Sequence, residues 1–212
     1  STGATVYTAV KTAKEKLGAS SNHAAVFWPK GAVGEKIYCL SAMAAAETAA
    51  TDAANGDVPH ESPSNKDLEI TATVLDDGTE VALDQEQANL LNGQGVITAI
   101  NANGFKLWGN NTAAYPSTTD PKDRWLAVRR FFDWDGNNFI LTYFQKVDKP
   151  GNKRLIQSIV DSQNIIGNGY VARDYCAGYR LEFKEDENPI TDLLDGKLTT
   201  HTYLAPYIPA EK

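Results

Sequence analysis

The spacing of apolar residues in the first quarter of the chain predicts helices that alternate with short strands. Residues 5–17 have helical spacing that ends at Gly18. The apolar run 24–28 predicts a short buried strand, residues 31–34 are expected to form a loop, and residues 37–40 predict another short strand. An alanine-rich stretch from Ser41 to Asn55 favours a helix that starts at the serine and packs closely on its neighbour. This alternation is typical of an α/β layer.

Two local signals in the next part of the chain predict a helix start and a hairpin. Asp84 and Gln87 have the spacing of a capping box, so a helix is expected from there to residue 91 or 92. Asn103-Gly104 lies between two apolar runs and predicts a tight turn between strands 96–100 and 105–108. The proline- and serine-rich stretch 57–66 is expected to be an exposed loop.

A change of composition separates this part from the second half. Residues 109–123 are rich in Gly, Asn, Thr and Pro, and they predict a domain linker or a long loop. Residues 125–130 fit either a strand or the start of a helix. The pattern then predicts two helices, 131–144 and 153–166, with a turn at 133–138 in the first and a helix cap at Gly167 after the second.

The last two strands complete the predicted fold. Residues 175–183 alternate as a strand, and residues 197–204 form another that stops where Pro206 and Pro209 remove backbone donors. The fold class is therefore expected to be α/β and α+β. It comprises a partial three-layer α/β domain, residues 1–116, followed by a two-layer α+β C-terminal domain, residues 117–212.

The terminal strand has the character of an edge strand, because neither of its faces is apolar enough for the centre of a sheet. An edge strand carries open hydrogen-bonding groups. In most proteins it is the last strand of its own sheet, but it can also pair with a strand of another chain. The candidates for such an intersubunit edge are Tyr179, Leu181, Phe183, Leu198, Thr200, Thr202 and Leu204.

Charge and cysteine content limit the classes of partner. The 27 acidic residues against 20 basic ones argue against nucleic acid, since phosphate binding needs clustered Lys and Arg. No apolar run reaches the length needed for membrane insertion. The chain lacks an initiator Met, so we expect a trimmed core that is truncated at its N-terminus. Cys39 and Cys176 are expected to be two buried free thiols, with a disulfide as the alternative.

The motifs for catalysis are absent or weak. The histidines His23, His60 and His201 accompany no nucleophile motif of a hydrolase. The stretch 133–138 opens like a calcium loop but has the wrong glycine register, and Gly167 to Ala172 matches a dinucleotide pattern without the required preceding strand. We therefore predict no catalytic, cofactor-binding or metal-binding residues, and no enzyme activity.

A basic cluster stands out in this acidic chain. Arg129 and Arg130, with Lys122 and Arg124 close by, either form internal salt bridges or contact an acidic face of a neighbouring subunit. The candidate charges for an intersubunit contact are Arg129, Arg130, Glu182, Glu185 and Asp186, with Glu187 beside them.

Six short segments together cover nearly the whole chain: 24–29 (AAVFWP), 58–65 (VPHESPSN), 90–97 (LLN with GVI), 107–112 (LWGNNT), 125–130 (WLAVRR) and 187–211 (ENP, DGKL, AP and PAE). In this order they resemble motifs of the contractile tail sheath proteins of myovirus-type phages and phage-tail-like bacteriocins. Ile97 and Asn111 depart from that pattern.

The resemblance implies a structural subunit of a contractile tail sheath. Such a subunit polymerises helically with itself around a tail tube by strand exchange, and it contracts to drive the tube through a cell envelope for genome ejection. The implied partners are further copies of the chain, the tail tube protein, and baseplate and tail terminator proteins. The implied location is the virion tail or a bacteriocin particle, assembled in the host bacterial cytoplasm from a phage, prophage or bacteriocin source. The alternatives are a degenerate hydrolase-like α/β enzyme and a secreted binding domain with a pocket lined by Trp108, Trp125 or Trp134.

Overall fold

The chain folds into two compact units in the computed structural model, which describes residues 3–149 and 151–210. The first unit runs up to Arg130 and also contains the residues from Ile208 onward, and the second unit is Phe131–Tyr207. The chain therefore passes between the units twice. The boundary predicted at residue 116 falls inside the first unit, and the division into domains there stays a prediction.

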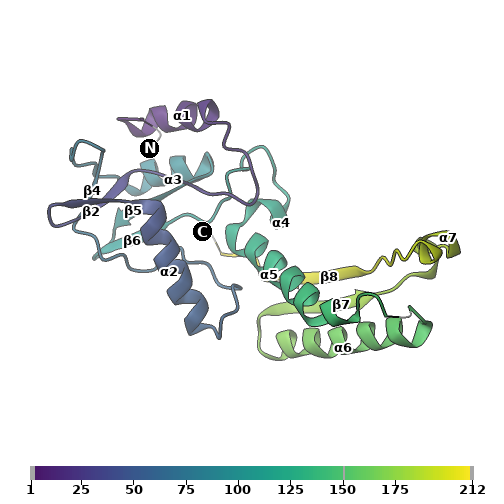
Figure 1. Cartoon of the computed structure of the whole chain (residues 1–212). Coiled ribbons are helices and arrows are strands. Elements are labelled where there is room, and N and C mark those ends of the chain that lie inside the picture. The colour runs from purple at the N-terminus through teal and green to yellow at the C-terminus, as the bar shows by residue number, and fades with distance from the viewer. Residues whose placement is uncertain (1–2, 150, 211–212) are drawn as a thin grey trace. The chain divides into compact units, whose positions relative to one another are not determined.

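The first unit is built around a three-stranded sheet with helices on both faces (Figure 1). Its strand order is β1-β5-β6, with β1 parallel to β5 and β6 antiparallel to β5. The strands are β1 (Val26–Phe27), β5 (Val96–Asn101) and β6 (Phe105–Trp108), and the helices are α1 (Val10–Lys16, after the 3-10 turn Tyr7–Ala9), α2 (Leu40–Ala54) and α3 (Gln85–Gly93).

Alternate residues of β5 show how the layers are stacked. Ile97 and Ala99 pack with Leu40 and Ala44 of α2, whereas Val96 packs in a second cluster with Val10 of α1 and Leu91 of α3. Successive side chains of a strand point to opposite faces, so α2 covers one face of the sheet and α1 and α3 cover the other. The predicted α/β class is confirmed in this unit.

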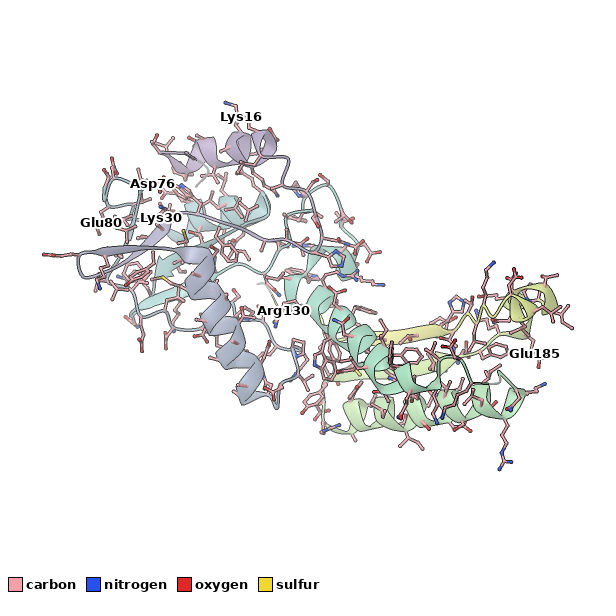
Figure 2. All side chains as sticks on the ribbon, in the orientation of Figure 1. Lys16, Lys30, Asp76, Glu80, Arg130 and Glu185 are labelled. Carbon is pink, nitrogen blue, oxygen red and sulfur yellow. The ribbon has the colours of Figure 1, made fainter. Side chains whose placement is uncertain are left out.

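A second small sheet of the first unit was not predicted in full. It is antiparallel, with the order β3-β2-β4, where β2 is Lys30–Val33, β3 is Lys36–Cys39 and β4 is Ala72–Val74. Residues 31–34 were expected to be a loop. Gly31 lies in this strand, and a Cβ there would lie 2.8 Å from Met43 Sδ, so any larger residue would require the Met43 side chain to shift. Lys30 Nζ pairs with Asp76 Oδ1 at 2.7 Å beside β4 (Figure 2).

Of the three local signals in the first unit, the Asp84 capping box and the Asn103-Gly104 turn are correct and the Ser41 helix start is not. The Gln87 N–H donates to Asp84 Oδ1 at 2.8 Å and the Gln87 side chain accepts from the Asp84 N–H, which confirms the capping box. The hairpin turn is also confirmed, with Asn103 and Gly104 at φ +57° and +112°. The predicted start of α2 at Ser41 is wrong, because Cys39 takes the N-cap position.

The loops of the first unit are more buried than predicted. Of the two alternatives predicted for 109–123, the structure shows the long loop and not a linker: residues 109–114 are buried, residues 119–122 are exposed, and the loop leads into α4 (Pro121–Arg124). The loop 57–66 is also only partly exposed, since Val58, Pro59 and Pro63 are buried. In α1, Lys14 is buried and its Nζ donates to the Gln94 and Tyr115 carbonyls at 2.8 and 2.6 Å. The Lys14 side chain thus joins α1 to the residue after α3 and to the loop 109–123 through two main-chain carbonyls.

The second unit is the predicted two-layer α+β arrangement, in which α6 packs along β7 (Figure 1). Helix α5 begins in the first unit and continues into the second, and β7 and β8 form a two-stranded antiparallel sheet. The elements are α5 (Leu126–Tyr143), a 3-10 turn (Phe144–Lys146), α6 (Lys153–Ala172), β7 (Cys176–Glu182), a 3-10 turn (Glu185–Glu187), α7 (Ile190–Leu194) and β8 (His201–Pro206).

Two predictions for the second half of the chain are wrong, and so is the predicted burial of one of the two cysteines. Helix α5 runs without a turn through residues 133–138. Helix α6 also continues past the cap predicted at Gly167. The glycine serves packing instead: a Cβ there would lie 1.9 Å from the Tyr179 ring, so its absence lets the helix and the strand approach each other. Both cysteines are free, but only Cys176 is buried, whereas Cys39 is exposed.

Candidate functional site

The β7–β8 sheet has two outer edges, and hydrogen bonding distinguishes them. Leu181 lies opposite Thr202 in the antiparallel register, and Tyr179 lies opposite Leu204. The Leu181 N–H donates to Asn164 Oδ1 at 2.8 Å, so it points away from β8. Leu181 and Thr202 therefore form a non-hydrogen-bonded pair, in which the main-chain groups of both residues face outward. The same holds two residues along for Tyr179 and Leu204.

A side chain of α6 closes the outer edge of β7. Asn164 Nδ2 donates to the Leu181 carbonyl at 3.0 Å, while Asn164 Oδ1 accepts from the Leu181 N–H. One amide side chain thus makes both of the bonds that a residue of a neighbouring strand would make. The β7 edge is thus satisfied within the unit at Leu181, the last residue but one of the strand.

The outer edge of β8 is different. Within the described residues the sheet has only two strands, so no strand lies beyond β8. The outward main-chain groups are those of Thr202 and Leu204, two of the residues predicted as edge candidates. Thr202 and Tyr203 are exposed, and Leu204 is half-buried. This edge has the open donors and acceptors that an extended segment can pair with.

The remaining edge candidates lie beside the ladder rather than in it. Strand β8 begins at His201, four residues later than predicted, and Phe183 follows the end of β7. The buried side chain of Asn188 explains the late start. It accepts from the Thr199 N–H at 2.8 Å and donates to the Thr199 carbonyl at 2.9 Å, holding Leu198 and Thr200 away from β7. Neither Asn164 nor Asn188 has a sequence signal that marks this role.

The charged candidates form ion pairs inside their own units. Arg130 pairs with Asp52 of α2, and Arg129 Nη1 lies 3.3 Å from Asp123 Oδ1 (Arg130 is labelled in Figure 2). In the second unit Glu182 pairs with Arg180, Glu185 with Lys153, and Glu187 with Lys184 and His201; Asp186 is exposed in the 3-10 turn. Internal pairing, one of the two alternatives for the arginines, is therefore present. An intersubunit role for these charges stays a prediction.

A buried carboxylate connects the layers of the second unit. Asp135 of α5 is 4% exposed, and its Oδ2 accepts from the Tyr179 hydroxyl at 3.1 Å. Gln163 Nε2 of α6 donates to the same hydroxyl oxygen at 2.7 Å, whereas Asp135 Oδ1 has no hydrogen-bond partner. Burial raises the pKa of Asp135, and the bond from Tyr179 offsets this only in part.

Replacing Asp135 by Asn is expected to stabilise the second unit at neutral pH. A folded-state pKa above the unfolded value gives stability that is complete below the unfolded pKa and is lost as pH rises through the folded one. The buried charge therefore costs stability at pH 7. The expected gain is on the order of 1 kcal/mol, the cost of a buried polar atom without a partner. Urea unfolding, monitored through the amide exchange of α6, should show that the gain in unfolding free energy of the variant shrinks as the pH is lowered. An equal gain at all pH values would contradict this prediction.

A polar cavity of about 350 Å³ lies in the first unit, and we call it the Asn–Trp cavity. Asparagine side chains and two tryptophans dominate its wall, and the last described residues of the chain, Pro209 and Ala210, lie along it. Its full lining is Ser62, Ser64, Asn65, Asn89, Asn92, Gly93, Trp108, Gly109, Asn110, Asn111, Tyr115, Arg124, Trp125, Pro209 and Ala210.

The described residues offer little for catalysis. They contain no group of three or more His, Cys, Asp or Glu side chains arranged for a metal ion. His201 is bound by Glu187 on the sheet, and the three histidines do not gather in the Asn–Trp cavity. In the same part of the chain, no helix combines the length and apolar character that crossing a bilayer requires.

Two curated proteins are similar to this chain in sequence. The tail sheath protein of Burkholderia phage BcepMu is 35% identical over 127 residues, which cover 58% of this chain and 26% of the relative. The tail sheath protein of Escherichia phage P2 is 32% identical over 147 residues, covering 67% and 34%. The chain thus spans about a quarter to a third of the curated relatives it matches. No protein-family model matches the chain.

Solved structures share the fold. The sheath complex of an extracellular contractile injection system (PVC) in the contracted state has a TM-score of 0.82 at 19% identity, covering 99% of this chain and 59% of that one. A chain of the anti-feeding prophage baseplate has a TM-score of 0.79 at 21% identity and covers 91% and 53%. The contracted helical sheath of the same prophage has a TM-score of 0.73 at 21% identity and covers 91% and 55%. The resemblance to tail sheath proteins predicted from the motifs is confirmed.

Proposed function

We propose that this relative of the phage tail sheath proteins is the core of a sheath subunit that polymerises helically around a tail tube and contracts. The observation that carries the proposal is the unequal pair of edges in the β7–β8 sheet. Asn164 satisfies the outward groups of Leu181 on β7, whereas the outward groups of Thr202 and Leu204 leave β8 open. An extended segment of a second copy would add at β8 and turn the two strands into a larger sheet.

Strand addition suits a polymer that must change shape. Main-chain hydrogen bonds do not depend on side-chain packing, so they can stay intact while the bodies of the subunits move. A contact that joins different surfaces of successive copies does not close on itself, and it produces a helical array. Contraction would then be a switch between two packings of the same subunits, driven by free energy stored during assembly.

The partners and the location follow from this role. The chain would contact further copies of itself, the tail tube protein, and baseplate and tail terminator proteins. Its location would be a phage tail or a tail-like particle, assembled in the cytoplasm of the host bacterium. The relatives named above are tail sheath proteins, so the hydrolase alternative is not favoured.

Electron microscopy tests the proposal directly. When the full-length gene product that carries this sequence is expressed together with its tube protein, striated sleeves around tubes are expected. The chain of 212 residues by itself should stay monomeric or associate weakly, because the open β8 edge needs a strand donated by another copy. Size-exclusion chromatography with light scattering measures this second point. Only amorphous or globular particles from the full-length protein would count against a sheath role.

A further inference from the structure

The end of α5 and the 3-10 turn after it carry an apolar surface that the strand-pairing role does not use. Its members, which we call the α5 ridge, are the exposed side chains Ile140, Leu141, Phe144 and Val147. Residues three and four positions apart are neighbours on a helix surface, so Ile140, Leu141 and Phe144 lie on one side. Phe131, on the opposite side of α5, is buried. The core of the second unit therefore uses the other side of the helix and leaves the ridge uncovered.

A second apolar surface of the same unit lies on α7 and the turn that follows it. Its members, which we call the α7 surface, are the exposed side chains Ile190, Leu193, Leu194 and Leu198. Figure 1 shows α7 beyond the end of the β7–β8 sheet, where β7 ends and β8 begins. Exposed apolar side chains that occur singly need no explanation, but a group of neighbouring ones marks an interaction site.

The two surfaces lie among opposite charges. Residues 146–154, at the end of the α5 ridge, contain four basic side chains and one acidic one, whereas residues 184–198 contain five acidic side chains and two basic ones. Lys153 and Glu185 pair with each other inside the unit, which leaves three basic against one acidic in the first segment and four acidic against two basic in the second. The remaining net charges of +2 and −2 attract these segments of different copies and orient their approach.

We infer that the α5 ridge of one copy receives the α7 surface of another copy. This contact rests on the proposed function, since it adds a second junction to the polymer. Both surfaces belong to the same unit and both are exposed among the described residues, so neither covers the other within one copy. A contact between two different surfaces need not close on itself, as a helical array requires. Four side chains a side are far fewer than the roughly 20–30 residues a side of a stable interface, so the contact acts alongside strand addition at β8.

Polar substitutions on the two surfaces test the contact in the full-length protein expressed with its tube protein. Leu141→Gln and Leu194→Gln change side chains that are 75% and 81% exposed, so the monomer should stay folded, which circular dichroism checks. Each variant removes one apolar side chain that the contact buries. We expect the protein concentration at which sleeves form to rise about ten-fold for each, measured by electron microscopy of a dilution series.

Ile165→Gln is the matched control. Ile165 of α6 is 72% exposed and belongs to neither surface, so this variant should form sleeves at the concentration of the parent. Sleeves at the parent's concentration from Leu141→Gln and Leu194→Gln would overturn the inference. An equal loss in all three variants would also overturn it, because the effect would then come from any polar change on the surface of the unit.

Cross-linking between two cysteine variants identifies the occupant of the ridge. One full-length copy carries Leu141→Cys and the other carries Leu194→Cys, with tags of different size, and both also carry Cys39→Ser because Cys39 is exposed. After co-expression with the tube protein and treatment with bismaleimidoethane, we expect a product that joins one copy of each variant, and no product from either variant alone. The absence of the mixed product, or a product of Leu141→Cys with itself, would overturn the inference whether or not sleeves form. Sleeves test the sheath role separately: sleeves without the mixed product would contradict this contact alone, and the mixed product without sleeves would support the contact and count against the sheath role.

Discussion

Thr202→Pro in the full-length protein is expected to abolish sheath assembly while leaving the monomer folded. The Thr202 N–H faces away from β7, so proline there removes no bond of the existing ladder and is tolerated as long as β8 is an edge. Once another strand adds, the missing donor leaves a carbonyl unpaired and the ring lies between the strands. A loss of about 1–3 kcal/mol for each contact raises the concentration needed for assembly by roughly five-fold to over a hundred-fold. Negative-stain electron microscopy and circular dichroism measure the two effects.

The neighbouring residue is the matched control for this experiment. The Tyr203 N–H points inward, because Arg180 and Tyr203 form a hydrogen-bonded pair. Tyr203→Pro should therefore lower the thermal stability of the monomer as well as assembly. Striated sleeves of normal length from the Thr202→Pro protein would show that strand addition takes place elsewhere.

Gly167→Ala is expected to destabilise the second unit strongly. The new Cβ would lie 1.9, 2.3 and 2.6 Å from three atoms of the Tyr179 ring, so the ring must move. Its displacement breaks the bonds that the Tyr179 hydroxyl makes with Asp135 and Gln163 inside the unit. Overpacking and a broken buried network together are expected to cost about 2–4 kcal/mol. Urea unfolding followed by amide exchange of α6 gives the value.

Gly169→Ala, two residues along the same helix, separates this clash from helix propensity. Its nearest neighbour would be the flexible end of Arg173, at 3.4 Å. Alanine is the better helix former by about 1 kcal/mol, so this variant should be as stable as the parent or more so. If both variants lost stability to the same degree, close packing against Tyr179 would not be the reason for the glycine.

Local chemistry made part of this structure predictable from the sequence. The Asp84 capping box and the Asn103-Gly104 turn depend on residues within a few positions of each other, and both were correct. The same applies to the terminal strand, whose lack of an apolar face marked it as an edge. The tail sheath resemblance rested on short motifs in the right order, and the curated relatives confirmed it.

The errors occurred where distant contacts override local preference. Gly31 and Gly167 were interpreted as loop and cap signals, but each lets a distant side chain approach the backbone, Met43 in one case and Tyr179 in the other. The segment 109–123 begins as the loop that its composition predicts, but the burial of Asn110 and Asn111, which hydrogen-bond to main chain, was not predicted. Asn164 and Asn188 close strand edges from helix and turn positions. A single sequence contains no periodicity that reveals these roles.

The two passages of the chain between its units have a mechanical consequence. Because the polypeptide leaves the first unit at Arg130 and returns at Ile208, a protease that cuts either passage alone leaves the other covalent link intact. Two links also resist twisting better than one. A force applied to either unit is transmitted through two covalent connections, helix α5 and the extended segment after β8.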